Sequence, residues 1–342
     1  MKLSRRKLEQ LKKQSMIQEI VKVFSFAGGD GVDYEDFDFT PEVEYTIGVN
    51  NKKFVRCNPK KLPNFIESMR GENSYVVPSK RVIADGNIPE NVSVIVKADM
   101  KKYVVREVIG SQVANWFNLN TCYNCAVNTA MGYDMISVDM IDNHEKLFTF
   151  YELKPINCWG TCEEQLEVVG DMLSDKNLIN HKITISSEQK EKIIEDYVYS
   201  HLVRRVLFSD DDFGTRNCGI LYNKGNRAVK VINFDYEYIA DPKGDTRSNT
   251  IKDIAYISRN YPNIFNKFLE KVAIIIIAKK GLYETLQNYP QTTDQNTSDI
   301  IKEILDKLFS NIDKIIAHSD SGKNILKNSL KTMLKEQDDY AK

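Results

Sequence analysis

The chain has 342 residues, of which 42% are apolar and 28% charged, a composition typical of globular proteins and a length that suits two compact units. Lysine and arginine total 47 against 48 aspartate and glutamate, so a balance of −1 does not favour nucleic acid as a direct partner. The longest apolar run, Val272–Ala278, is far below the roughly 20 residues that span a bilayer. No apolar signal segment follows the basic stretch Lys2–Lys13, and a cytoplasmic location is expected.

The first region, residues 1–40, is predicted to contain one helix and an acidic loop. Residues 3–23 carry a broad apolar stripe that includes Leu8, Leu11 and Val21, which predicts an amphipathic helix. Residues 24–40 are rich in glycine and aspartate and are expected to form a loop.

The second region, residues 41–155, is predicted to be a small sheet with one inserted helix. The helix is expected over Arg106–Leu119, where apolar residues recur at helical spacing. Asn50-Asn51 is predicted to turn between the first two strands. The predicted strands are residues 44–49, 53–57, 75–77, 81–84, 92–98, 126–129, 135–138 and 147–153.

The third region, residues 156–342, is predicted to be mostly helical. Ser186 and Gln189 form a capping box before a helix over Ile193–Phe208. A hairpin is expected over residues 220–234, and helices from Ile251 onward. A β-rich half followed by a helical half predicts an α+β fold with two lobes and a cleft between them.

The candidate chemistry lies around the sequence FSDDDFGTRNCGIL. Asp212 stands five residues before Asn217, and Asp235 ends the apolar strand that follows. Phosphoryl transfer needs one carboxylate near the attacking hydroxyl and further oxygen ligands for magnesium. The three residues are predicted to be the catalytic base, Asp212, and the magnesium ligands, Asn217 and Asp235. The alternative is a plain acidic turn between two elements.

Asp212-Phe213-Gly214 spells the DFG motif of ordinary protein kinases, but its position argues for another role. No D-x4-N precedes it, since Asp196 is followed five residues later by His201. The D-x4-N begins at Asp212 itself, so Asp212 is assigned as the base and Asp235 as the metal carboxylate.

Upstream, Lys97 ends the apolar strand VSVIVKAD, and Glu107 follows ten residues later near the start of the predicted helix. A strand lysine paired with a helix glutamate positions nucleotide phosphates in kinases. Lys97 is therefore predicted to bind phosphate and Glu107 to hold Lys97.

The order Lys97, Glu107, D-x4-N, Asp235 resembles the HipA-like family of atypical serine/threonine kinases, which is similar to phosphatidylinositol kinases. The matching stretch covers about residues 70–240. The resemblance implies a bilobal protein kinase-like fold, with a small β-rich N-lobe at 41–155 and a larger helical C-lobe at 156–342. It implies ATP and Mg²⁺ as cofactors, held by the residues named above.

The resemblance also implies two further parts of a nucleotide site. FYELKP would be the hinge that contacts adenine through backbone groups at Tyr151, Glu152 and Leu153. Residues 71–81 would form the loop over the phosphates, with Ser79 and Lys80 as binding residues and Ser74 or Ser79 as an autophosphorylation site.

This chain departs from the family pattern at Gly214, where His or Gln is usual, and carries Arg216, which would stabilise the transferred phosphate as a catalytic residue. The expected function is γ-phosphate transfer from ATP to Ser or Thr of a protein substrate. The alternatives are a phosphatidylinositol or other small-molecule kinase, and a pseudokinase that binds ATP without turnover. The resemblance suggests a toxin–antitoxin context with a small DNA-binding antitoxin as partner.

Six cysteines raise the question of a metal. Cys122 and Cys125 form a C-x2-C, and Cys158 and Cys162 a C-x3-C, spacings that suit a structural zinc. Buried cysteines equally serve as small apolar residues, and both interpretations stay open.

Overall fold

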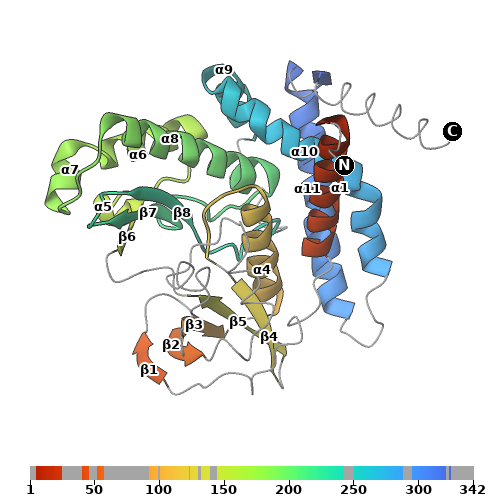
Figure 1. Cartoon of the computed structure of the whole chain (residues 1–342), viewed down its shortest axis with the longest axis horizontal. Coiled ribbons are helices and arrows are strands. Elements are labelled where there is room, and N and C mark those ends of the chain that lie inside the picture. Colours follow the sequence, from red (N-terminus) through yellow and green to blue (C-terminus); the bar gives the residue numbers. More distant parts are fainter. Residues whose placement is uncertain are drawn as a thin grey trace.

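The computed structural model describes residues 5–24, 41–45, 52–57, 92–98, 101–122, 124–129, 132–138, 145–241, 250–287, 295–320 and 323–324. Two antiparallel sheets and a set of helices make up this part of the chain (Figure 1).

The first sheet has five strands in the order β1-β2-β3-β5-β4. Its third strand in sequence, β3, lies at the centre and is followed in the chain by the long helix α4, Lys101–Trp116. Lys97 on β3 pairs with Lys52 on one side and Met135 on the other. The strands are β1 Pro41–Tyr45, β2 Lys52–Cys57, β3 Val92–Ala98, β4 Asn124–Thr129 and β5 Gly132–Val138.

The second sheet has three strands in the order β6-β7-β8 and packs beneath helix α8 (Figure 1). These strands are β6 Glu145–Thr149, β7 Cys218–Asn223 and β8 Val229–Asn233. The neighbouring helices are α5 Phe150–Leu153, α6 Cys162–Met172, α7 Asp175–Asn180 and α8 Ser187–His201, the last continued by a π-helical segment, Leu202–Leu207.

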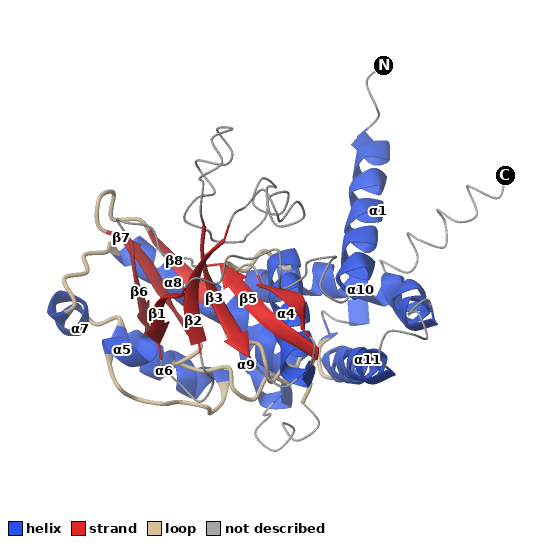
Figure 2. Ribbon diagram, turned by 90° about the horizontal axis from the view of Figure 1, so that it is seen from below, coloured by secondary structure: helices blue, strands red, loops and turns tan. Residues whose placement is uncertain are grey.

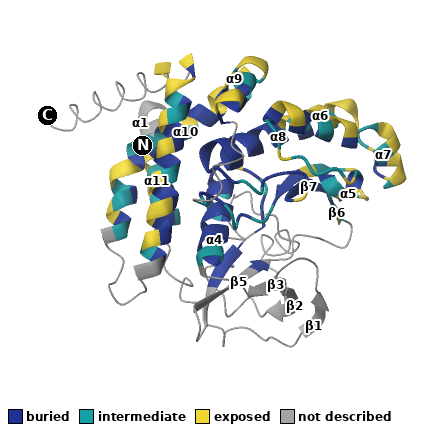
Figure 3. Cartoon of the chain, turned by 180° about the vertical axis from the view of Figure 1, so that it is seen from behind, coloured by how far each residue is buried: buried dark blue, intermediate teal, exposed yellow. Residues whose placement is uncertain are grey.

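The remaining helices form a group beside α4. Figures 1 and 2 both show α1 lying along α10, and α1 also contacts α4. One continuous apolar core joins α4, α8, the second sheet and these helices, and Figure 3 shows α4 almost wholly buried. The group comprises α1 Arg5–Phe24, α9 Thr250–Asn260, α10 Pro262–Gln287 and α11 Gln295–Ala317.

Most of the predicted elements are confirmed. The first helix, the strand at 92–98, the hairpin of β7 and β8 and the helical C-terminal region all occur where they were expected. The Ser186–Gln189 capping box is present at the start of α8. The loop at 24–40, the Asn50-Asn51 turn and the strands at 75–77 and 81–84 lie outside the described residues.

Three predicted bounds were wrong, and in the first of them the helix expected over 106–119 runs from Lys101 to Trp116. The strand expected over 147–153 ends at Thr149, because Thr149 and Glu152 form a capping box that starts the helical turn α5. The helix expected over 193–208 begins at Ser187, directly after its Ser186 cap, and changes to π-helical geometry from Leu202.

The pairing of β6 also bears on the predicted division at residue 155. β6 lies inside the range predicted for the N-lobe, yet it pairs with β7 from the range predicted for the C-lobe. The division of the chain into three units therefore remains a prediction. Hydrogen bonds join β6 to β7, a strand of the third predicted unit. Among the described residues, no helix combines the length and apolar character needed to cross a membrane.

Candidate active site

The loop at residues 210–217, here the aspartate loop, joins the π-helical segment to β7 and brings two of the predicted residues into contact. The Asn217 side-chain amide donates to the Asp212 carboxylate at 2.7 Å and to the Asp212 carbonyl at 3.0 Å. The D-x4-N spacing thus closes a compact turn, in which Asn217 Nδ2 is committed to Asp212 and Oδ1 remains an acceptor.

Arg204, on the π-helical segment, connects the aspartate loop to the segment after β8. Its guanidinium forms an ion pair with Asp210 at 2.6 Å, and both side chains are buried. It also donates to the carbonyls of Asn217 at 3.1 Å, Phe234 at 2.8 Å and Asp235 at 2.5 Å. One buried cation therefore fixes the backbone at both predicted metal ligands.

The charge state of this arginine follows from its surroundings. Burial, the largest single influence, lowers the pKa of Arg204, but the Asp210 carboxylate, Tyr236 and Cys218 together raise it, and the net pKa lies above the usual value. Asp210 in turn accepts the backbone N–H of Asp212 at 3.2 Å through its other oxygen. The guanidinium also stacks over the rings of Tyr236 and Phe213, at 4.2 and 4.9 Å from their centroids.

Asp235 has a backbone φ of 61°, in the left-handed region that few residues other than glycine adopt. Such a conformation persists only where surrounding contacts impose it. Here Arg204 holds the Asp235 carbonyl, while Glu107 holds the next residue by accepting the Tyr236 N–H at 2.6 Å. The chain is thus bent sharply at the predicted metal carboxylate.

Glu107 lies deep in this site, projecting from α4 with only 3% of its surface exposed. One oxygen accepts the Tyr236 N–H and the other accepts Asn124 Nδ2 at 3.1 Å. Carboxylate oxygens of Glu107, Asp235 and Glu237 lie within 4.8 Å of one another. Hard oxygen donors in this number suit a divalent cation such as Mg²⁺.

Asp212 is half-buried, and its environment shifts its acidity. Burial raises the pKa of the Asp212 carboxyl, the hydrogen bond from Asn217 lowers it, and the nearby charges of Asp210 and Asp235 raise it, with a net increase. A carboxylate with a raised pKa is better suited to accept a proton from a hydroxyl than an ordinary surface aspartate is.

The presence of glycine at position 214, where the resembled family usually has His or Gln, has a steric explanation. A Cβ at this position would lie 2.9 Å from the carbonyl oxygen of Cys158. The segment before α6 covers the aspartate loop here, and Arg205 donates to the carbonyls of Trp159 and Asp211. The glycine follows from this close backbone approach.

The predicted hinge residues lie next to the aspartate loop. Tyr151 donates its N–H to the Thr215 carbonyl at 2.8 Å, and Glu152 donates its N–H to Thr149 Oγ1 at 3.0 Å. These two N–H groups are therefore already engaged within the chain, while Leu153 is buried in the core. Arg216 is exposed and stacks over Tyr151, 4.5 Å from the ring centroid.

The remaining predicted residues are described incompletely or not at all. The backbone of Lys97 lies in the middle of the first sheet, but its side chain is outside the described residues. Ser74, Ser79 and Lys80 also lie outside them. Whether Glu107 pairs with Lys97 therefore remains a prediction.

The cysteine pairs do not assemble into a metal site within the part of the chain that the structure describes. There, the acidic cluster at Glu107 is the sole group of three or more potential ligands, and it contains no cysteine. Cys122, Cys125 and Cys162 are buried, and none of them forms a disulfide among the described residues. Burial raises the pKa of Cys122 to about 11, which disfavours the thiolate that zinc requires.

An apolar surface beside Asp235 was not predicted. Cys122, Leu221 and Ile232 form a small buried cluster, on which the partly exposed Leu147 and Phe234 pack. Leu147 and Leu221 are directly paired across β6 and β7, so both lie on one face of the second sheet.

Several residues of the site escaped the sequence-based prediction. Arg204 and Asn124 contact segments that no local spacing connects to them, whereas Asp210 and Glu237 each stand two residues from a predicted site residue. The triplet Asp210-Asp211-Asp212 was a visible signal, because three adjacent carboxylates need compensation. The buried arginine in the preceding helix is the residue that supplies it.

Comparison with known proteins finds structural likeness only. No family model and no curated protein sequence matches the chain. The structure is similar to that of CtkA, a proinflammatory kinase of Helicobacter pylori, with 13% identity and a TM-score of 0.45 over 71% of this chain and 94% of that one. It is also similar to HipA of Shewanella oneidensis MR-1, solved with HipB and operator DNA, with 11% identity and a TM-score of 0.44 over 86% of this chain and 69% of that one.

Proposed function

We propose that this protein is a kinase that transfers the γ-phosphate of ATP to a hydroxyl group, with Ser or Thr of a protein as acceptor. The observation that carries the proposal is the network around Arg204. Arg204 donates to the backbone carbonyls of Asn217 and Asp235, and Asn217 contacts Asp212, although Asp235 lies beyond a hairpin; these bonds support a common site for the three residues. An acidic surface turn would not need a buried arginine to hold its backbone.

Each residue has a role that its environment supports. Asp212 accepts the proton of the attacking hydroxyl, for which its raised pKa is favourable. Asn217 Oδ1 and the Asp235 carboxylate would hold Mg²⁺, with Glu237 close to Asp235. The ion would neutralise charge on the phosphates. Lys97 would bind the phosphates of ATP, and the exposed Arg216 would stabilise the transferred phosphate.

Adenine would lie against the apolar surface formed by Leu147, Leu221 and Phe234, because a nucleobase needs a flat apolar contact. The engaged N–H groups of Tyr151 and Glu152 direct base recognition to other groups of the hinge. From the family resemblance we add that the loop at 71–81 would cover the phosphates, with Ser79 and Lys80 as binding residues. The same resemblance suggests a small DNA-binding antitoxin as partner.

The test is incubation of the purified protein with γ-labelled ATP and Mg²⁺, alone and with lysate proteins. Asp212→Ala is expected to reduce transfer by about 10²–10⁴-fold, as loss of a general base does. Asp235→Ala is expected to abolish dependence on Mg²⁺ together with transfer. The control is Asp175→Ala, an exposed residue of α7 paired only with Lys190 at 2.6 Å, which should leave transfer unchanged.

The outcomes separate the alternatives. Equal labelling by wild type, Asp212→Ala and Asp235→Ala would refute the assignment. Thermal stabilisation by ATP without transfer to any acceptor would identify a pseudokinase. Label in lipid or small molecules, with none in phosphoserine or phosphothreonine, would replace the protein acceptor by a small-molecule acceptor.

A further inference from the structure

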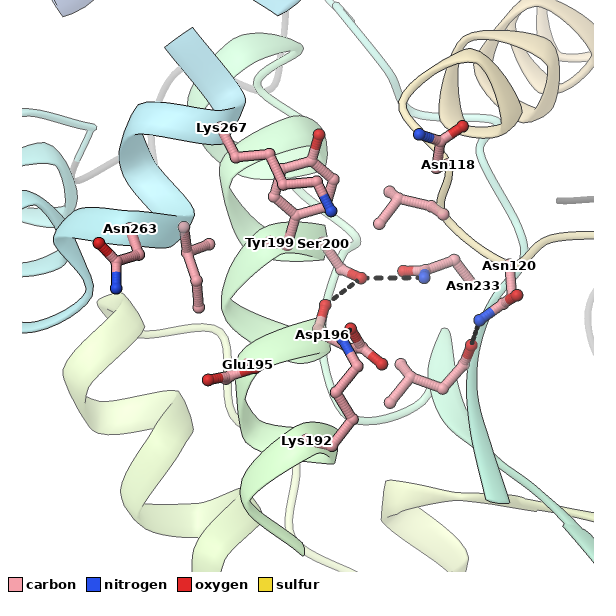
Figure 4. A pocket seen from close by; sticks show the side chains of 13 residues that line it. Asn118, Asn120, Lys192, Glu195, Asp196, Tyr199, Ser200, Asn233, Asn263 and Lys267 are labelled. Atoms are coloured by element: carbon pink, nitrogen blue, oxygen red, sulfur yellow. Dashed lines mark hydrogen bonds and ion pairs between the residues drawn. The ribbon is translucent and has the colours of Figure 1, made fainter. Parts of the chain in front are cut away.

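A second concave site lies on the other side of β8. It is a cavity of about 390 Å³ between α8, β8, the start of α10 and the segment that links α4 to β4 (Figure 4). Its floor contains Tyr199, Ser200 and Asn233, all buried, and its rim carries Asn118, Asn263 and Lys267, all exposed.

This cavity is separate from the candidate active site because successive residues of a strand face opposite sides. Val231 and Asn233 line the cavity, whereas Ile232 and Phe234 belong to the apolar surface proposed for adenine. The strand β8 therefore forms a wall of both sites.

The floor of the cavity contains polar atoms whose hydrogen-bonding capacity is unused. Asn233 donates through Nδ2 to Ser200 Oγ at 3.0 Å, but its Oδ1 has no hydrogen-bond partner among the described residues. The same is true of the Tyr199 hydroxyl. Both atoms are buried, and buried polar atoms are costly unless a partner satisfies them. A polar ligand that enters the cavity, with a small side-chain adjustment, would supply partners.

The charges around the cavity indicate the chemistry of the ligand. Lys192 and Asp196 neutralise each other at 2.6 Å. Glu195 and Lys267 form no ion pair with any other described residue, and the Lys267 ammonium lies over the Tyr199 ring, 5.4 Å from its centroid. Figure 4 shows Lys267 beside the Tyr199 ring and Glu195 about one turn earlier on α8. One cation and one anion thus remain for an incoming molecule.

We propose that this cavity binds a small zwitterion of the free amino acid class. The carboxylate would pair with Lys267 and the ammonium with Glu195, while polar groups of the ligand meet Asn233 and the other amides of the lining. The volume lies at the lower end of the range found for small-molecule sites, which suits a compact metabolite.

The position of the cavity also couples it to Asp235, a step that rests on the proposed function. Asn233 donates its N–H to the Asn120 carbonyl at 2.9 Å, and Asn120 Nδ2 donates to the Val231 carbonyl at 3.1 Å. These bonds join β8, which leads directly to Asp235, to the segment that follows the helix of Glu107. A bound zwitterion would stabilise the contact between β8 and this segment and so raise the affinity of the protein for nucleotide.

The test measures binding of each common amino acid, at about 5 mM, to the purified full chain by thermal shift, followed by calorimetry on those that stabilise it. Lys267→Gln is expected to weaken binding of the best amino acid about tenfold or more. The same variant should not change binding of that amino acid's carboxamide, which lacks the carboxylate. Glu195→Gln should weaken the amino acid similarly and leave its deaminated acid unaffected.

Lys280→Gln and Glu284→Gln are the matched controls, since these exposed residues of α10 pair with each other at 3.6 Å away from the cavity. Equal affinities for Lys267→Gln and Lys280→Gln would overturn the assignment, as would the lack of any binding below about 10 mM. ATP affinity is then measured with and without the amino acid. An unchanged value would refute the coupling, and failure of ATP to bind at all would refute the proposed function while leaving the zwitterion site intact.

Discussion

The two faces of β8 differ in how their polar groups are satisfied. On the side of Asp235, a buried arginine donates to three carbonyls and one carboxylate, and Glu107 accepts from two further donors. On the side of Asn233, two buried polar atoms have no partner among the described residues, and two rim charges have no ion pair there. The backbone of the first site is held by internal hydrogen bonds, although the Tyr236 hydroxyl there also lacks a partner among the described residues, whereas the second site offers two such atoms and two charges to a molecule from outside.

This difference predicts which substitutions will change stability and activity most. A site whose geometry depends on internal hydrogen bonds should lose both stability and activity when one of its central groups is removed. A site that offers unsatisfied groups should tolerate substitution and change only in what it binds.

The largest effect is expected for Arg204→Met. Removing one partner of a buried ion pair leaves Asp210 charged and uncompensated, which costs about 3–5 kcal/mol of the free energy of unfolding. Denaturant unfolding would measure this loss. Phosphoryl transfer should fall together with stability, because the carbonyls of Asn217 and Asp235 lose their donor.

The double variant Arg204→Met/Asp210→Leu separates the two effects. An apolar pair in place of a buried ion pair is often neutral for stability, so the double variant should regain most of the lost free energy. Transfer should stay low, since no group replaces the hydrogen bonds to the backbone. Full recovery of transfer would show that Arg204 serves only to neutralise Asp210.

A smaller effect is expected at the contact between α4 and Tyr236. A Cβ on Gly110 would lie 2.5 Å from Tyr236 Cβ, and Tyr236 directly follows Asp235. Gly110→Ala should therefore cost about 1–3 kcal/mol by overpacking and raise the Mg²⁺ concentration needed for half-maximal transfer. The measurements are denaturant unfolding and a Mg²⁺ titration.

Gly170→Ala is the matched control, because this helical glycine of α6 has no neighbour within 4 Å of an added Cβ. It should stabilise the protein by up to about 1 kcal/mol and leave the Mg²⁺ requirement unchanged. A shifted Mg²⁺ requirement in both variants would mean that glycine replacement acts through general stability.

The extent to which the sequence predicted the fold depended on whether a signal was local. The Ser186–Gln189 cap and the strand at 92–98 follow from neighbouring residues, and both are confirmed. The end of β6 was misplaced because its apolar pattern runs on to Leu153, while a cap at Thr149 stops the strand. The pairing of β6 with β7 could not be predicted, since those strands are about 70 residues apart and no single-sequence pattern specifies it.

The candidate site shows the same limit. The D-x4-N at Asp212 was visible in the sequence, and the structure places its two ends in direct contact. Arg204 was not predicted, because an arginine inside a helix usually lies on a solvated face. Its burial depends on carbonyls supplied by residues 217–235, which only the folded chain brings together.

The acid limb of the pH profile offers a test of the hydrogen bond within the aspartate loop. Asp212 must be deprotonated to act as a base, so transfer should fall as the pH drops through its raised pKa. Asn217 stabilises the carboxylate by donating to it at 2.7 Å. Asn217→Ala also removes a proposed Mg²⁺ ligand and should lower the rate, but in the residual activity it should raise the pKa of Asp212 further and move the acid limb of kcat to higher pH. An unmoved limb would assign that ionisation to another group.

The smallest expected effect is a gain in stability from Asp212→Asn. Because burial and neighbouring carboxylates raise the pKa of Asp212 in the folded chain, its ionised form costs stability at every pH above that pKa. The neutral amide removes this cost and still accepts the bond from Asn217 through its oxygen. The Tm of the variant should exceed that of wild type by about 1 °C or more at neutral pH, and the difference should vanish below the ordinary carboxyl pKa, where both forms are neutral.

Addition of Mg²⁺ and ATP should leave this difference largely unchanged, because the proposed function assigns the ion to Asn217 and Asp235 and gives Asp212 a role in the transfer step alone. A variant that gains stability, keeps its nucleotide-dependent rise in Tm and loses transfer would show that the carboxylate is retained for chemistry at a cost to the fold. If Asp212→Asn instead lowered the Tm, the carboxylate would be a structural acceptor of the aspartate loop and the base would have to be sought elsewhere.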